Sequence, residues 1–463
     1  MPADTQKLSI REKIGYSLGD CAANFVFQTQ LIFLMNFYTD VFGITAAAAG
    51  TMFLVSRLWD AFNDPVMGAL ADRTNTRWGR FRPWVLATAV PFGILFVLAY
   101  TTPDFGPTGK LIWAYITYNA LMMIYTANNI PYSALTGVIT ADSDERTSLV
   151  SWRFILAMTA GFLVASFTDK LVILFGQGDE ARGYQLTMAL WAVLAVVFFV
   201  ITFATTKERV QPNPHQKTSI LQDLKDLLTN RNWIALAALT LFVFIYLSMR
   251  GSMTKYYFDY YVARQEPFAW DPLGLTPFGM FNALSMIANI LGILFSKSLS
   301  VRFGKRNVFR VCLFLTAVGT ALFALLPGTA TAAIYGLQVT LQFSYGITIP
   351  LLWAMMADVA DFSEWKNNRR ATAMTFAATV FTLKLGLSIG GALAGWLLGQ
   401  YGYVPNVEQS AQALEGIRLM MSVFPAIAFC VGVGALLFYG IDRRMELTIE
   451  QDLADRRKSF QYT

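Results

Sequence analysis

The chain has 463 residues, of which 55% are hydrophobic and only 14% are charged, and its mean hydropathy is +0.46. A soluble domain carries roughly 25% charged residues, so this composition excludes an ordinary soluble protein and predicts one that crosses a membrane several times. The net charge of +6 does not imply a nucleic-acid partner, because basic residues in short loops are what orients a membrane protein.

Cysteine and histidine are too scarce for redox chemistry or a structural metal site. Cys21, Cys312 and Cys430 all fall in apolar stretches and are interpreted as small buried hydrophobic residues. The single histidine, His215, lies in a polar segment. A Gly-x-Ser-x-Gly sequence surrounds Ser388, but it falls inside an expected helix, and no intramembrane histidine is present to activate the serine. We therefore expect no enzyme and no cofactor.

Twelve stretches of the chain are apolar and long enough to cross a membrane as helices. The residues before the first stretch lack the apolar core of a signal peptide, and Ser9-Ile10-Arg11-Glu12 has the spacing of a capping box, so the first helix is expected to be retained. The expected spans cover about 13–42, 46–71, 84–100, 111–139, 149–175, 187–204, 233–262, 278–299, 308–326, 332–359, 371–399 and 420–441.

The longest polar segment divides these spans into two sets of six. We interpret residues 207–231 as a cytoplasmic linker between an N-terminal bundle, 1–206, and a C-terminal bundle, 232–442, with a cytoplasmic tail at 443–463. A weak repeat supports this division, because Arg-Trp-Gly-Arg-Phe-Arg after the second span is echoed by Arg-Phe-Gly-Lys-Arg after the eighth. The expected fold is an all-α membrane protein of twelve transmembrane helices in two pseudosymmetric six-helix halves.

Loop charges predict the orientation of the chain in the membrane. Basic residues cluster before the first span, in the segments 73–82 and 302–310, in the linker and in the tail, whereas alternate loops such as 41–45, 327–331 and 401–412 contain none. By the positive-inside rule, both termini are expected to be cytoplasmic.

Two carboxylates lie inside the second span. Asp60 and Asp64 are four residues apart and share a helical face with Asn63, and Arg57 lies one turn earlier. A solvated soluble helix would also carry such a stripe, but the neighbouring residues are Met, Phe, Leu, Val and Trp. Carboxylates at membrane depth are costly and usually bind ions, carry protons or pair with a cation.

Other spans also contain polar side chains. Asp20 and Asn24 lie one turn apart in the first span, and Lys384 lies in the eleventh, where it is expected to need a carboxylate partner. Asp358 and Asp361 fall at the end of the tenth span and are interpreted as gate or inter-helix salt bridges, with a solvated turn as the alternative. Arg57 is placed in the same gating group.

Several motifs together resemble one family. Gly68 to Arg80 resembles the loop motif of the major facilitator superfamily, and much more of the chain resembles its glycoside-pentoside-hexuronide:cation symporter family, which includes melibiose and β-glucuronide permeases. The matching segments are 14–20, 37–43, 57–68, 129–132 and 401–406. The resemblance implies a symporter of a bacterial inner membrane in which a cation and a sugar bind near mid-membrane and alternating access moves them together.

The resemblance also implies the site residues. In the melibiose branch the cation site corresponds to Asp60, Asn63, Asp64 and Thr126, while Asn129 stands where that branch has a carboxylate, and Asn24 where it has a sugar-binding aspartate. The matching or chemically suited residues on the sugar side are Asp20, Asn24, Asn129, Tyr132, Arg153, Arg250, Trp353 and Lys384.

The coupling ion and the sugar remain open at this point. Sodium needs several oxygens at once, so the loss of an acid at Asn129 favours protons, with Asp60 or Asp64 as the carrier and Na⁺ at those carboxylates as the alternative. The substrate is expected to be a glycoside, pentoside or hexuronide, neutral or anionic, and a carrier of lysolipids or other amphiphiles on the same fold is the alternative. The expected partners are the sugar, the cation and the lipid bilayer, and the protein is expected to be a monomer.

Overall fold

The computed structural model describes residues 7–140, 143–209, 225, 227–262, 273–367 and 372–461. Within these ranges, the side chain of Arg57 and those of several neighbours on its helix lie outside the described part. Most of the expected linker, including His215, also lies outside it.

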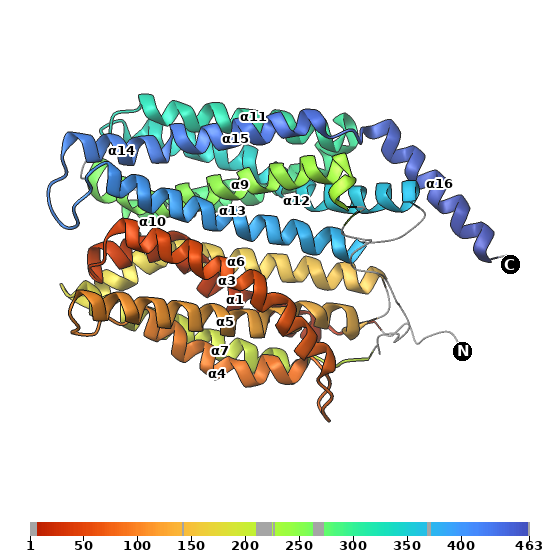
Figure 1. Ribbon diagram of the computed structural model, residues 1–463, viewed down its shortest axis with the longest axis horizontal. Coiled ribbons are helices and arrows are strands. Elements are labelled where there is room, and N and C mark those ends of the chain that lie inside the picture. Colours follow the sequence, from red (N-terminus) through yellow and green to blue (C-terminus); the bar gives the residue numbers. More distant parts are fainter. Residues whose placement is uncertain are drawn as a thin grey trace. The chain divides into compact units, whose positions relative to one another are not determined.

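The described residues are almost entirely helical (Figure 1). In the first half of the chain the helices are α1 (Ile10–Ile32), α2 (Leu34–Asn36), the π-helical segment η1 (Phe37–Val41), α3 (Ala46–Arg73), α4 (Arg82–Ala99), α5 (Pro107–Ile139), α6 (Ser143–Gly176) and α7 (Glu180–Thr205). In the second half they are α9 (Arg231–Tyr256), the π-helical segment η2 (Tyr257–Tyr261), α10 (Pro277–Phe303), α11 (Lys305–Leu322), η3 (Phe323–Leu325), α12 (Thr331–Asn367), α13 (Thr372–Gln400), α14 (Ala411–Met421), α15 (Val423–Ala435), η4 (Leu436–Phe438) and α16 (Arg443–Gln461). The only strand-like pairing in the described part is an isolated bridge between Thr76 and Gly79.

Nine helical stretches of the described residues are long and apolar enough to span a membrane. The prediction of an all-α membrane protein is therefore confirmed. Helices α1 and α5 are long enough but are not among these nine, and both carry polar residues that the sequence singled out, which lowers their hydropathy. In α3 the stretch Ala46–Ser56 is apolar, and side chains directly after it lie outside the described part.

The chain folds as two compact units. The first unit comprises Met1–His215, Gln265–Ala283 and Val404–Val407, and the second comprises the remaining residues. Two short segments that the expected boundaries place in the C-terminal bundle thus belong to the first unit. Their contacts explain this, because Asn406 Nδ2 donates to the carbonyl oxygen of Asp40 at 2.6 Å and Lys170 Nζ donates to that of Leu273 at 2.7 Å.

Each unit has its own pattern of helix packing. In the first unit α1 lies along α6 and α7, α4 packs on α5 and α7, and α3 packs on α5. In the second unit α9 lies along α13 and α15, α11 packs on α12 and α15, and α16 contacts α12. Glycines permit the closest approach: a Cβ at Gly390 of α13 would lie 2.5 Å from the carbonyl oxygen of Ile245 in α9.

The start of α1 forms half of the expected capping box. Ser9 Oγ accepts the backbone N–H of Glu12 at 3.2 Å, which confirms Ser9 as the N-cap. The Glu12 carboxylate instead receives two hydrogen bonds from the guanidinium of Arg209, at 2.7 and 2.9 Å. Glu12 therefore forms an ion pair with a distant arginine instead of the second hydrogen bond of the capping box, which would run back to the N–H of Ser9.

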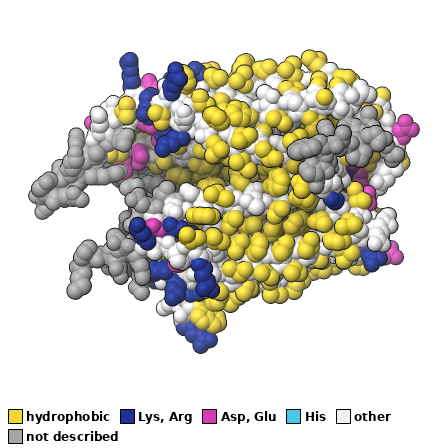
Figure 2. Space-filling model, turned by 180° about the vertical axis from the view of Figure 1, so that it is seen from behind, with side chains coloured by type: hydrophobic (Ala, Val, Ile, Leu, Met, Phe, Trp, Pro, Cys, Tyr) yellow, Lys and Arg dark blue, Asp and Glu magenta, His cyan; other side chains and the backbone are white. Residues whose placement is uncertain are grey.

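The outward faces of the helices are apolar, as a lipid environment requires. Figure 2 shows hydrophobic side chains covering the helical surfaces, with Lys and Arg side chains near helix ends. Cys21 and Cys312 are buried, but Cys430 is exposed, so the prediction of burial is wrong for that residue. An apolar stretch does not distinguish a side chain facing the protein from one facing lipid.

Candidate functional site

The expected cation residues of α3 and α5 contact each other. Thr126 Oγ1 donates to Asp64 Oδ1 at 3.2 Å, across the packed faces of the two helices. Asp60 lies one turn before Asp64 and is only 2% exposed. Asn63 Nδ2 is buried without a hydrogen-bond partner among the described residues. Two carboxylates, a hydroxyl and an amide thus gather at one place, and their oxygens suit a proton or a hard cation.

A second polar cluster joins α1, α5 and α6. Arg153 of α6 faces the carboxylate of Asp20 in α1, with Nε 3.0 Å from Oδ2 and Nη2 donating to Oδ1 at 3.3 Å. The same guanidinium lies 5.2 Å from the ring centroid of Tyr132 in α5. We call this group, together with Tyr16 of α1, the α1–α5–α6 junction. The ion pair spans 133 residues of sequence, and a second ion pair, Lys13–Glu145 at 2.8 Å, joins α1 and α6 nearer their ends.

The side chains of the junction differ in their access to solvent. The side chain of Arg153 is 24% exposed and that of Asp20 is 10% exposed, whereas Tyr132 is fully buried. The ion pair is therefore partly exposed, whereas the tyrosine ring is not. A direct sugar contact of Tyr132 stays a prediction, which its full burial does not favour.

The two asparagines that replace expected acids have different surroundings. Asn24 Nδ2 donates to the carbonyl oxygen of Asp20 on its own helix at 2.9 Å. Asn129 is half-buried on α5, one turn after Thr126. Its neighbour Asn128 is buried and donates to Thr88 Oγ1 of α4 at 2.8 Å, so it is the amide that joins two helices.

Arg250 in the second unit has neutral partners. Its Nη1 donates to Tyr246 Oη at 2.9 Å and its Nη2 to Gln338 Oε1 at 2.7 Å, and the guanidinium lies 4.5 Å from the ring centroid of Phe323. Gln338 in turn donates to Ser285 Oγ at 2.9 Å. Arg250 is 4% exposed, and in the described part of the chain no carboxylate pairs with it.

The other expected sugar residues of the second unit lie on α12 and α13. Trp353 is half-buried against the hydrophobic core of this unit. Lys384 is half-buried on α13, and its carbonyl oxygen accepts a hydrogen bond from Ser388 Oγ at 2.8 Å. The hydroxyl of Ser388, the serine of the Gly-x-Ser-x-Gly sequence, is therefore hydrogen-bonded to the backbone of its own helix. A carboxylate partner for Lys384 from the second span stays a prediction.

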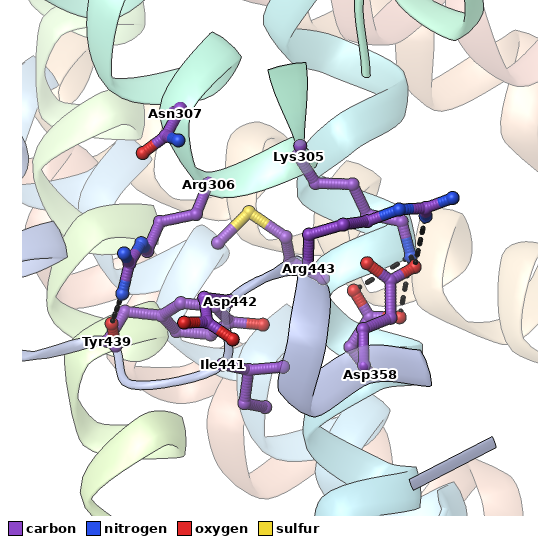
Figure 3. Close-up of a pocket in the computed structure, with 11 residues that line it drawn as sticks. Lys305, Arg306, Asn307, Asp358, Tyr439, Ile441, Asp442 and Arg443 are labelled. Atoms are coloured by element: carbon purple, nitrogen blue, oxygen red, sulfur yellow. Dashed lines mark hydrogen bonds and ion pairs between the residues drawn. The ribbon is translucent and has the colours of Figure 1, made fainter. Parts of the chain in front are cut away.

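A charged cavity of about 410 Å³ lies where α11 begins, beside α12 and α16. Lys305 Nζ lies 2.7 Å from Asp358 Oδ1 and 2.8 Å from Glu446 Oε1, so one ammonium bridges carboxylates of two helices. Asp361 lines the same cavity. Figure 3 shows Lys305 between Asp358 and the α16 chain, with Arg306 turned away to donate to the Tyr439 carbonyl oxygen at 3.2 Å. The side chain of Arg57, the third residue of the expected gating group, lies outside the described residues.

One carboxylate that sequence reasoning missed organises the end of the first unit. Glu208 accepts the backbone N–H groups of Arg80, Phe81 and Arg82, at 2.9, 2.8 and 3.0 Å. These are the unpaired donors at the start of α4, where a negative charge also favours the helix dipole. Gly79 adopts φ 112°, and a Cβ there would collide with the Glu208 carboxylate. The next residue, Arg209, has its pKa raised by its hydrogen bonds to Glu12.

Two packed helical units and buried charges within the spans define a polytopic membrane transporter. Residues 15–443 match the family model described as MFS/sugar transport protein, and the chain belongs to that family. The protein is therefore a multi-pass membrane transporter and not an enzyme.

Relatives of known description support the same conclusion. The chain is 38% identical over 461 residues to the inner membrane symporter YicJ of Escherichia coli, covering 99% of this chain and 97% of that protein. It is 38% identical over 452 residues to the putative glycoside/cation symporter YagG of the same organism, covering 97% and 96%. The resemblance to glycoside:cation symporters is thereby confirmed.

A solved structure shares the fold. A bacterial homologue of the human drug peptide transporters aligns with a TM-score of 0.65 at 12% identity, covering 92% of this chain and 97% of that chain. At this level of identity the likeness concerns the fold alone.

Proposed function

We propose that the protein is a secondary active symporter that couples inward flow of a cation to uptake of a glycoside by alternating access. The contact between Thr126 and Asp64, beside the buried Asp60, is the observation that carries the proposal. A sugar transporter that worked by facilitated diffusion alone would have no need for two carboxylates at this depth, since each is costly to bury.

Protons are the favoured coupling ion, and sodium is the alternative. The side chains that could coordinate a cation are Asp60, Asn63, Asp64 and Thr126. One turn after Thr126, α5 carries the amide of Asn129. An amide supplies no negative charge, so the site offers sodium one anionic oxygen fewer than a third carboxylate would. A proton needs only one carboxylate.

A neutral glycoside is the favoured substrate. The cation that a sugar can reach in the first unit, Arg153, is already neutralised by Asp20. Together they offer both donors and acceptors, which suits hydroxyl groups better than a carboxylate. An anionic sugar would compete with Asp20 for the guanidinium. In the second unit Trp353 and Lys384 are the proposed sugar residues, with Asp358 and Asp361 in the gate. Arg250, which was also expected to contact the sugar, is 4% exposed and donates to Tyr246 and Gln338, so we propose a framework role for it instead.

The proposed setting is a bacterial inner membrane with both termini in the cytoplasm. Helices α1, α3 and α5 then cross the membrane with the nine more apolar stretches, which gives twelve spans. The packing of α1 on α6 and α7 and of α5 on α4 supports this, because both helices lie beside helices of membrane-spanning length, and α3 in turn packs on α5.

Uptake into proteoliposomes tests the proposal. The panel contains neutral galactosides, neutral xylosides and glucuronides, each measured under an imposed proton gradient and, separately, a sodium gradient. We expect proton-driven accumulation of a neutral glycoside. Sodium-driven uptake would contradict proton coupling, and a preference for glucuronides would contradict the neutral substrate. Binding of lysolipids with no glycoside uptake would favour the amphiphile carrier instead.

A further inference from the structure

The buried ring of Tyr132 is held by α1 at several points. Its ring stacks on that of Tyr16, with centroids 4.8 Å apart and planes inclined by 11°. Tyr132 Oη donates to the Tyr16 carbonyl oxygen at 2.8 Å, and the Tyr16 hydroxyl is hydrogen-bonded to Thr136, one turn further along α5. Both tyrosines are fully buried. The ring of Tyr132 can therefore neither rotate nor tilt without breaking contacts to α1.

A glycine on the same face of α1 completes this arrangement. A Cβ at Gly19 would collide with the ring of Tyr132. Tyr16, Gly19 and Asp20 are spaced by three and four residues, so they share one face of α1. That face supplies a ring and a close backbone for Tyr132 and a carboxylate for Arg153.

The orientation of Arg153 depends on two restraints. The Asp20 carboxylate attracts the guanidinium, and the face of the Tyr132 ring supports it at 5.2 Å from the centroid. The two-point contact with the carboxylate fixes which donors of the guanidinium face Asp20. The ring face restricts movement of the guanidinium toward α5.

We propose that Tyr16 is a positioning residue for glycoside binding, which fixes the ring of Tyr132 and thereby the donors that Arg153 presents. The inference rests on the proposed function, because it assumes that Arg153 binds the sugar. Neither Tyr16 nor Gly19 is itself accessible to a ligand, since Tyr16 is fully buried and Gly19 is covered by the tyrosine ring. Their effect on the substrate passes through Tyr132 and Arg153.

The test compares three variants by proton-driven uptake in proteoliposomes. Y16L removes the stacked ring, and Y16F keeps the ring while removing the hydroxyl. F25L is the matched control, because Phe25 is equally buried on α1 and stacks on Trp191 with centroids 5.1 Å apart, away from the junction. KM and maximal rate are measured for the glycoside that the wild-type protein accumulates.

We expect Y16L to raise KM about tenfold, in the range set by the loss of one aromatic stack, with the maximal rate changed by less than about twofold. Y16F should keep KM within about twofold of the wild-type value, and F25L should leave it unchanged. An unchanged KM in Y16L, or an equal rise in F25L, would overturn the inference while leaving the proposed function intact.

A second variant covers the case in which Y16L fails to fold. Gly19→Ala pushes on the ring of Tyr132 without removing Tyr16, and it should also raise KM more than the maximal rate falls. An unchanged KM in this variant would overturn the inference. If the wild-type protein accumulates no glycoside of the panel, the proposed function fails first, and this inference fails with it.

Discussion

Arg153 in the first unit and Arg250 in the second are both arginines of membrane-spanning helices beside aromatic rings, but their partners differ. Arg153 faces the carboxylate of Asp20, whereas Arg250 donates to a tyrosine hydroxyl and a glutamine amide. The first contact cancels the charge, and the second satisfies donors while leaving the charge in place. Arg153 also remains partly accessible, while Arg250 is 4% exposed.

This difference in partners has different consequences for the two sites. A buried ion pair is sensitive to the loss of either member, because the remaining charge is left without a partner. A buried arginine with several neutral acceptors loses stability in smaller steps as each acceptor is removed. The first arrangement suits a site where a ligand enters and competes for the ion pair, and the second suits a fixed part of the framework.

The largest expected effect concerns the carboxylates of α3. Asp64→Asn should abolish uphill accumulation, because the amide can no longer bind a proton or supply an anionic oxygen, while substrate exchange down a gradient persists. Thr126→Val, which removes only the hydroxyl that donates to Asp64, should reduce accumulation without abolishing it. Both are measured as the steady-state ratio of internal to external glycoside. Full accumulation by Asp64→Asn would contradict the assignment of the cation site to α3 and α5.

The next effect separates the two arginines by stability. Arg153→Gln leaves Asp20 without its partner and should lower the free energy of unfolding by about 3–5 kcal/mol. Adding Asp20→Asn removes the remaining charge and should restore most of that loss. Thermal unfolding in detergent measures both. A double variant as unstable as Arg153→Gln would mean that the ion pair acts through packing alone.

A smaller effect is expected at the neutral partners of Arg250. Gln338→Leu removes one acceptor from the guanidinium and should cost about 1.5–3 kcal/mol, the range for a hydrogen bond to a charged group. Thr340→Val is the control, because Thr340 is exposed on the same helix and donates only to its own backbone. If the two variants unfolded at the same temperature, the proposed framework role of Arg250 would be contradicted.

The smallest effect is expected where charges remain partly solvated. Lys305→Gln removes the ammonium between Asp358 and Glu446. All three side chains line the cavity of about 410 Å³, where water can solvate the remaining carboxylates, so the change should cost only about 1 kcal/mol. It should nevertheless release α16, which limited proteolysis would detect as faster cleavage of the tail. Lys297→Gln, at an exposed position of α10, is the control. Equal cleavage rates in the two variants would rule out Lys305 as the anchor of α16.

The sequence was sufficient for features that depend on local pattern. Membrane spans follow from long apolar runs, the cap at Ser9 follows from residue type and spacing, and the four-residue spacing of Asp60 and Asp64 places both on one face of α3. The contact between Asp64 and Thr126 was expected from the family resemblance, and the structure brings the two side chains together.

Features that depend on distant parts of the chain could not be predicted in this way. Asp20 and Arg153 were expected to contact the sugar separately, and nothing in their local sequence indicates that they pair. Two of the neutral partners of Arg250, Gln338 and Phe323, come from other helices, and Glu208 caps a helix that begins more than a hundred residues earlier. Cys430 was misplaced because a uniformly apolar helix has no pattern to indicate which side faces lipid.

The carboxylate of Glu208 also binds the segment after α7 to another helix. Glu208 lies three residues beyond the end of α7. Its carboxylate accepts three backbone hydrogen bonds from the start of α4. Arg209, the next residue, is tied to Glu12 on α1 and to the Val138 carbonyl oxygen at the end of α5. Residues 206–209 are therefore fastened to the ends of α1, α4 and α5, and they could not separate from the first unit without breaking hydrogen bonds to three other helices.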